Sequence, residues 1–280
     1  MTRGLELLVL SLAALVAGLR AQDITPRSTR EVRRLLLEAD PPDISMPVWT
    51  SQKDAPPASY ARNPFVWTGP RIDLTGKAVW NSRTTSFGTT AISPLHVIYA
   101  EHVAGLYPPG TIIRFVAKDD AVVERIVKSS VRIGDTDIDL STLDTPLPGT
   151  IHWFKVMPAK WFVGCSRQAP GSVGGLPCVI MDGNTQSIAV KDVAGFGPGV
   201  FVTGSPVDRR RVAFTRELHP GDSGSPMFIL IGGELILDGI YHTPQGGSEV
   251  SACIAALDTA MRPGGFHVTV ADFPDPRVRR

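Results

Sequence analysis

The spacing of Gly and Pro is the feature of this sequence that most constrains its fold. The chain holds 27 Gly and 24 Pro among 280 residues, and they recur along most of its length. Both residue types form turns and interrupt helices. The pattern argues against a bundle of long helices and favours short strands joined by turns.

Short apolar runs begin at about Phe65, and Gly, Pro or Asp clusters separate them. Many short strands at close spacing predict an all-β sandwich or barrel. One later segment, Ile254–Met261, is expected to form a short C-terminal helix that stops at Pro263-Gly264. The strand-like runs are Ala91–Ile92, Val97–Ala100, Ile112–Val116, Val122–Val127, Cys178–Met181, Ile188–Val190, Val200–Val202 and Val212–Phe214.

Composition narrows the class of protein. Hydrophobic residues make up 43% of the chain and charged residues 20%, which excludes a fully disordered chain. The formal net charge is +1, whereas nucleic-acid-binding proteins usually carry a basic face. We therefore expect a folded protein without a nucleic-acid partner.

Residues 1–21 have the pattern of a signal peptide. The apolar run Leu7–Ala17 is too short to span a bilayer comfortably, and small residues lead to Ala21. An uncleaved anchor is the alternative. The pattern predicts a secreted or periplasmic protein with no stable membrane insertion after cleavage.

Residues 22–64 are expected to form an N-terminal arm or pro-segment. Ser28–Glu31 has capping-box spacing, and Val32, Leu35, Leu36 and Ala39 follow at helical intervals. This predicts one short helix that ends at Pro41-Pro42. An extended linker is expected over Asp43–Asn63, and a basic tail over residues 271–280.

Cys165, Cys178 and Cys253 are the three cysteines. In an oxidising compartment Cys165 and Cys178 could pair, and three buried thiols are the alternative. No Cys or His spacing indicates a metal site.

A serine between glycines gives the strongest chemical signal, in Pro220-Gly221-Asp222-Ser223-Gly224-Ser225-Pro226. A tight turn of this kind can expose the Ser223 hydroxyl as a nucleophile. The backbone N–H groups of Gly221 and Ser223 can form an oxyanion hole. An ordinary Gly/Ser/Pro turn is the alternative.

A serine nucleophile needs a base, and an imidazole needs a carboxylate to orient it. His102 directly follows an apolar run and is the candidate base, whereas His96 precedes the run. Alternation places Asp135, Asp137 and Asp139 on one strand face, so any of the three could orient the imidazole.

These segments resemble the trypsin/chymotrypsin-like serine proteases, including their bacterial V8-like branch. Ser93–His102 is similar to the strand and "A-A-H" segment of the family, Asp137–Leu143 to "D-I-A-L-x-x-L", and Gly221–Pro226 to "G-D-S-G-S-P". The resemblance spans Phe65–Met261 and implies Asp137 as the orienting carboxylate. It also implies two six-stranded antiparallel β-barrels, over residues 65–155 and 156–270, with the site between them.

The chain departs from the family in a few places. Glu101 replaces a small residue, Val103 stands where the family has a cysteine, and no Ile-Val-Gly-Gly start appears. Arg71-Ile72, near the start of the first barrel, is the candidate site of an activating cleavage. Asp222 could pair with the N-terminal amine that this cleavage would create. We favour a protein that needs no new terminus, in which local hydrogen bonds satisfy Asp222.

The substrate pocket is expected beside a returning hairpin. Met227–Ile231 and Leu235–Tyr241 flank a Gly232-Gly233 turn, which brings the second strand back beside Ser223. By resemblance, the pocket wall is formed by Tyr241, His242 and Thr243. Glu217 falls near the pocket floor, and a surface position for Glu217 is the alternative.

The combined prediction is a secreted, monomeric serine endopeptidase that acts on proteins or peptides without a cofactor. A catalytically weak or inactive protease-like binding protein and a serine esterase are the alternatives. The order His102, Asp137, Ser223 argues against the common esterase folds, in which the nucleophile comes first.

Overall fold

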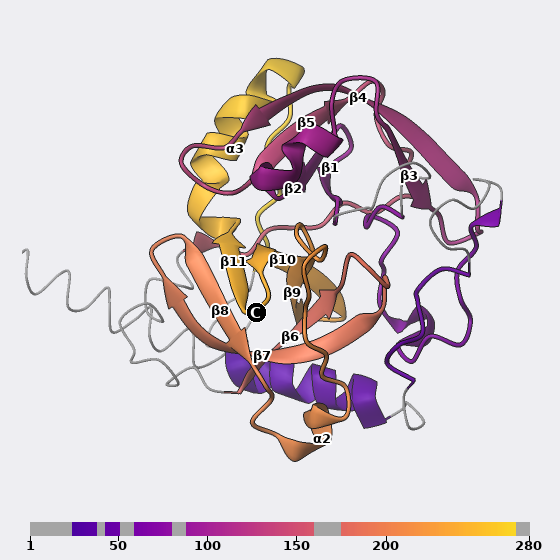
Figure 1. The fold of residues 1–280 in the computed structure, drawn as a ribbon, viewed down its shortest axis with the longest axis vertical. Coiled ribbons are helices and arrows are strands. Elements are labelled where there is room, and N and C mark those ends of the chain that lie inside the picture. Colours follow the sequence, from indigo (N-terminus) through magenta and orange to yellow (C-terminus); the bar gives the residue numbers. More distant parts are fainter. Residues whose placement is uncertain (1–23, 38–42, 51–58, 80–87, 160–174, 273–280) are drawn as a thin grey trace, which may run out of the picture.

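The computed structural model describes residues 24–37, 43–50, 59–79, 88–159 and 175–272 (Figure 1). The expected signal peptide, Cys165 and nearly all of the expected basic tail lie outside these ranges. The described chain is mostly β, with few helices and two sheets, as the sequence predicted. The expected strand Val212–Phe214 is wrong, because the short helix α2 (Arg209–Val212) and a turn occupy these residues. No described helix has both the length and the hydropathy needed to cross a bilayer.

The first sheet has five antiparallel strands in the order β1-β2-β5-β4-β3 and curls into a half-barrel. Its edges, β1 and β3, do not pair with each other. Residues 77–79 lie between them, where Ala78 N–H donates to Thr89 O (3.0 Å) and Val79 N–H donates to Arg114 O (2.9 Å). The expected two-barrel all-β fold is confirmed, but within the described residues this half has five strands instead of six, and single hydrogen bonds replace strand pairing across the gap. The strands are β1 (Thr90–Ser93), β2 (His96–Tyr99), β3 (Ile112–Val116), β4 (Val122–Arg132) and β5 (Asp139–Leu143).

The second sheet closes into a six-stranded barrel in the order β10-β11-β8-β7-β6-β9. Gly232 and Gly233, both with positive φ (68° and 78°), form the turn between β9 and β10, as expected for a tight hairpin. The strands are β6 (Leu176–Met181), β7 (Ile188–Gly197), β8 (Val200–Gly204), β9 (Pro226–Ile231), β10 (Glu234–Thr243) and β11 (Gly246–Glu249).

Side chains at alternate positions of the barrel strands pack into two different apolar clusters. Val179 belongs to the larger cluster, which extends into the first sheet through Ile92 and Phe115. Cys178, its neighbour in β6, belongs to a smaller cluster within the second half of the chain. Both faces of β6 are thus buried, which explains why its apolar run is continuous rather than alternating.

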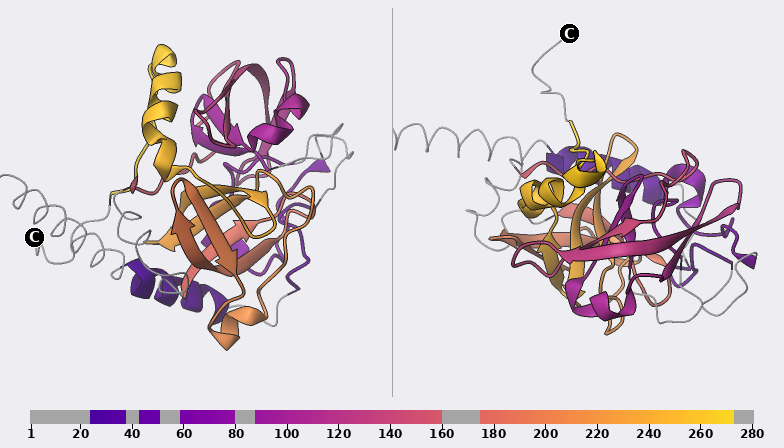
Figure 2. Two further views of the ribbon diagram at one scale, coloured as in Figure 1. Left: turned by 60° about the vertical axis from the view of Figure 1, so that its left-hand side comes forward. Right: turned by 90° about the horizontal axis from the view of Figure 1, so that it is seen from above.

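α3 (Ile254–Met261) follows β11 and has the bounds expected from the sequence. Leu257 and Met261 bury their side chains in the larger cluster, and the Phe266 ring packs on His96 with centroids 5.4 Å apart. α3 therefore packs beside the first sheet (Figure 2).

The N-terminal arm packs against the closed barrel (Figure 1). Its helix covers residues 24–37, so it begins before the expected cap at Ser28. The Ser28 hydroxyl donates instead to Pro177 O (3.4 Å), and Val32 is fully buried. Glu31 accepts hydrogen bonds from Gly232 N–H (2.8 Å) and Gly233 N–H (2.9 Å).

The segment expected as an extended linker, Asp43–Asn63, is folded against the core where it is described. Trp49 and Tyr60 are both 1% exposed. Val48 N–H donates to Gln186 O (2.9 Å), which ties this segment to the second sheet. The linker expectation is therefore wrong, because apolar side chains without any periodicity still found buried positions.

Candidate active site

β2 and the turn after it position His102. β2 ends at Tyr99, and the 3-10 helix η3 (Glu101–Leu106) begins two residues later. Val103 is buried and anchors this turn, while 45% of the His102 side chain stays exposed. The prediction that His102 follows a strand end is confirmed.

The neighbouring histidine, His96, has a structural role. Its Nδ1 lies 2.8 Å from Ser93 Oγ, and burial lowers the pKa of His96 to about 4. An imidazole with so low a pKa is a weak base, so His96 is not the candidate for taking a proton from Ser223.

Asp137 lies in the turn between β4 and β5. β5 begins at Asp139, so the expected strand face shared by Asp135, Asp137 and Asp139 is wrong: the first two are turn residues. The Asp137 carboxylate accepts from the His102 backbone N–H at Oδ1 (2.8 Å) and from His102 Nδ1 at Oδ2 (2.7 Å). These two bonds fix the imidazole with Nδ1 toward Asp137.

The two flanking aspartates have other surroundings. Asp139 is 5% exposed and accepts from the Tyr99 hydroxyl (3.4 Å), and burial raises the pKa of its carboxyl. Asp135 is exposed to solvent. The structure thus brings Asp137 alone of the three to His102.

Ser223 lies in the loop before β9, and its Oγ is 2.8 Å from His102 Nε2. Main-chain hydrogen bonds hold this loop: Gly224 N–H donates to Tyr241 O (2.8 Å), and Gly88 N–H donates to Ser223 O (3.0 Å). Gly224 has φ 81°, and a Cβ there would lie 2.4 Å from Gly88 O. Only glycine fits at this position next to the serine.

The N–H groups of Gly221 and Ser223 have no hydrogen-bond partner in the described part of the chain. Gly221 has φ 103°, in the left-handed region that favours glycine. A pair of unpartnered donors on one turn is the arrangement that an oxyanion hole requires.

Asp222 is 3% exposed, and local hydrogen bonds satisfy it as expected. Its Oδ1 accepts from Asn184 N–H (2.8 Å) and its Oδ2 from His219 N–H (2.7 Å). Burial raises the pKa of Asp222, and these two hydrogen bonds oppose that rise. Both carboxylate oxygens thus have partners within the described chain.

The structure places His242 beside Asp137. His242 Nδ1 lies 3.4 Å from Asp137 Oδ2 and 3.3 Å from Ser248 Oγ. The side chain expected to line the pocket therefore contacts the carboxylate that orients His102.

The other expected pocket residues are dispersed. Tyr241 is 1% exposed, and its hydroxyl lies 2.9 Å from Thr203 Oγ1 inside the barrel. Glu217 is exposed, so its carboxylate does not form a buried pocket floor. Thr243 is exposed at the end of β10, where its hydroxyl donates to Gly246 O (3.1 Å).

Cys178 and Cys253 are buried free thiols. Cys178 Sγ donates to Lys191 O (3.4 Å), so Cys178 is not in the disulfide considered from the sequence; Cys165 lies outside the described residues. Burial raises the pKa of both thiols, that of Cys253 to about 12. No three His, Cys, Asp or Glu side chains of the described chain converge as metal ligands.

Sequence reasoning missed Asn184 and Gly88. Asn184 is separated from Asp222 by 38 residues, and neither Asn184 nor Gly88 belongs to a recognisable motif. A Cβ on Gly88 would lie 2.3 Å from Gly224 O, so the close approach explains the glycine. Only the folded chain brings these residues to the site.

The arrangement provides a hydroxyl, a base in contact with it, a carboxylate that orients the base, and two N–H donors without partners in the described ranges. These are the parts needed for attack on an acyl carbon with stabilisation of the resulting oxyanion. A scan against protein-family models matches none of them to this chain, and a search of curated proteins finds no match.

Proposed function

We propose that this protein is a secreted serine endopeptidase that cleaves peptide bonds through an acyl-enzyme. One observation carries the proposal: Asp137, His102 and Ser223 are connected in series, at 2.7 Å and 2.8 Å, beside two N–H donors that have no partner among the described residues. A structural turn has no need for this combination.

In the proposed reaction, Ser223 Oγ attacks the scissile carbonyl while His102 Nε2 takes its proton. Asp137 stabilises the imidazolium, and the N–H groups of Gly221 and Ser223 bind the oxyanion. The C–N bond breaks as His102 returns the proton to the leaving amine. Water then hydrolyses the acyl-enzyme by the same route, and no step uses a cofactor.

Peptide substrates are favoured over simple esters by the order of the three residues and by the fold. The order His102, Asp137, Ser223 on an all-β chain is that of the protease family which the motifs resemble. The apolar run at Leu7–Ala17 supports secretion or a periplasmic location. A monomer is sufficient for the proposed reaction, because the three residues meet within one chain.

Labelling with a fluorophosphonate probe tests the nucleophile, with Ser223→Ala as the control. We expect rapid labelling of the wild-type protein and none of Ser223→Ala. Casein and a p-nitrophenyl ester then separate the substrate classes. Turnover of the ester alone would favour an esterase, and absence of both labelling and turnover would favour a binding protein.

A further inference from the structure

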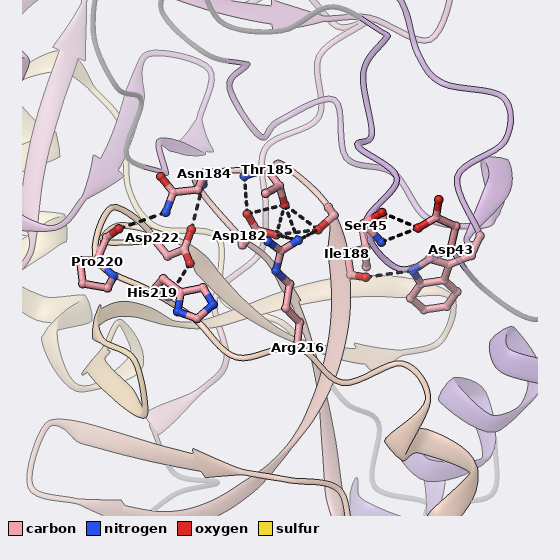
Figure 3. A network of polar contacts seen from close by, with 12 residues as sticks. Asp43, Ser45, Asp182, Asn184, Thr185, Ile188, Arg216, His219, Pro220 and Asp222 are labelled. Carbon is pink, nitrogen blue, oxygen red and sulfur yellow. Dashed lines mark hydrogen bonds and ion pairs between the residues drawn. The ribbon is translucent and has the colours of Figure 1, made fainter.

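Asn184 touches the catalytic loop at two points (Figure 3). Its backbone N–H donates to Asp222 Oδ1 (2.8 Å), and its side-chain Nδ2 donates to Pro220 O (3.1 Å). A Cβ on Gly221 would lie 2.6 Å from Asn184 Oδ1, so the amide packs directly on the Gly221 backbone. One residue thus contacts three successive positions of the loop that precedes Ser223.

The contact with Pro220 O bears on the oxyanion hole. Pro220 C=O and Gly221 N–H belong to the same planar peptide unit, and in a trans peptide they point in opposite directions. Fixing the carbonyl toward Asn184 therefore fixes the Gly221 N–H on the opposite side. Without this bond, rotation of the peptide unit would remove one of the two oxyanion donors.

A polar network holds the turn that carries Asn184. Asp182 is 1% exposed, and its Oδ1 accepts from Thr185 N–H (2.6 Å). Arg216 Nη1 donates to Thr185 Oγ1 (2.6 Å) and Ser187 Oγ (2.7 Å), and lies 3.4 Å from Asp182 Oδ2. Arg216 comes from the chain that leads into the catalytic loop, so the network joins the loop to the turn (Figure 3).

We propose that Asn184 is a positioning residue that orients the Pro220–Gly221 peptide for oxyanion binding, and that Arg216 and Asp182 hold it there. The inference rests on the proposed peptidase function. In this arrangement, residues of the uncleaved chain alone hold the loop that precedes Ser223. The loop then needs no amine from a cleaved terminus to hold Asp222.

The test compares Asn184→Ala with Asn63→Ala. Asn63 Nδ2 also donates to a proline carbonyl, Pro47 O (3.0 Å), but among the described residues Asn63 forms no hydrogen bond with residues 220–223. Loss of one oxyanion donor costs about 10²–10³-fold in kcat, so we expect Asn184→Ala to lose roughly 10²-fold with KM nearly unchanged. Affinity for a peptide aldehyde should fall by a similar factor, because its hemiacetal oxygen occupies the oxyanion site. Asn63→Ala should keep the wild-type values.

Asn184→Asp provides a second variant if the alanine variant fails to fold, as thermal unfolding would reveal. It keeps the size of the side chain but loses the donor, so kcat should fall as well. Wild-type kcat in both Asn184 variants, or an equal loss in Asn63→Ala, would contradict the inference alone. An inactive, unlabelled wild-type protein would contradict the proposed function and this inference with it.

Discussion

The Asp137 carboxylate is contacted from two histidines. His102 supplies its backbone N–H and Nδ1, and His242 Nδ1 lies 3.4 Å from the same Oδ2 that accepts from His102 Nδ1. Because His102 is bound through both main chain and ring, little rotational freedom remains to be lost when substrate arrives. The exposed imidazole is therefore ordered before any ligand is present.

Substitutions of Ser223, His102 and Asp137 should lower activity without changing the fold. Ser223→Ala and His102→Ala should lower kcat by roughly 10⁴–10⁶-fold. Asp137→Asn should cost about 10⁴-fold, because an amide cannot hold the reactive tautomer. Steady-state kinetics with a peptide substrate, alongside circular dichroism, provides the measurement.

Asp135→Asn and Asp139→Asn are the matched controls, since each makes the same chemical change nearby. The Asp139 carboxyl bonds to Tyr99, so its replacement should affect stability more than kcat. If Asp139→Asn proved the crippling change, Asp137 would not be the orienting residue.

At the scale of elements, β10 and β11 contain two buried carboxyl groups. Asp238 is 0% exposed and Glu249 is 4% exposed, and within the described chain both Asp238 oxygens and Glu249 Oε1 lack hydrogen-bond partners. Burial raises the pKa of both, that of Glu249 to about 8. The folded state therefore holds protons that the unfolded chain releases.

This predicts that the free energy of unfolding falls as pH rises from about 4.5 toward 8. The contribution of Glu249 is fully present below the ordinary glutamate pKa of 4.5 and is lost as pH rises through the folded-state pKa of about 8. Glu249→Gln should reduce the slope by up to about 1.4 kcal/mol per pH unit. Urea unfolding at several pH values measures this, and the exposed Glu217→Gln should keep the wild-type slope.

The helix over residues 24–37 is tied to the β9–β10 turn by the two hydrogen bonds that Glu31 accepts. Removing a charged acceptor from two N–H groups that water can reach should cost about 1 kcal/mol, or roughly 2–4 °C in Tm. Glu31→Ala tests this by thermal unfolding. Arg30→Ala, at an exposed position on the same helix, should leave Tm unchanged. Equal shifts of Tm in the two variants would mean that the effect comes from the helix itself and not from the Glu31 hydrogen bonds.

Continuous apolar runs such as β9, and the helix Ile254–Met261, were predictable because their own residues carry the signal. The start of the first helix was not, since the Ser28 hydroxyl bonds to Pro177 O, 149 residues away, instead of capping. At the site, motif order identified Ser223 and His102. Strand periodicity failed at Asp137 because that residue lies in a turn, whose geometry follows no period.

At the scale of the molecule, Arg71 connects the N-terminal arm to the rest of the chain. Its Nη1 donates to Leu35 O (2.9 Å), its Nη2 to Trp67 O (2.7 Å) and its Nε to Thr68 O (2.9 Å). The next residue, Ile72, is 5% exposed. The Arg71–Ile72 peptide bond, the candidate site of activating cleavage, is thus held within the fold.

We expect intact Gln22–Arg280 to be active, and Arg71→Gln to lower Tm while keeping kcat per folded molecule. Active-site titration with the fluorophosphonate probe gives the count of folded sites, and mass spectrometry verifies that the chain is uncut. An inert Arg71→Gln protein, beside a wild-type protein that gains activity only on cleavage after Arg71, would contradict this.

The packing of α3 on the first sheet bears on how substitutions will act. His102 and Asp137 lie in segments that follow β2 and β4 of the first sheet, whereas Ser223 lies in the loop before β9 of the second, so one 2.8 Å contact joins the two halves. The arm is fastened to the closed barrel, and α3 is fastened back onto the half-barrel. We therefore expect substitutions at buried positions far from the serine, such as Leu257 and Val32, to change how closely base and nucleophile meet. Such substitutions would change the rate of the proposed reaction without altering a single reacting group.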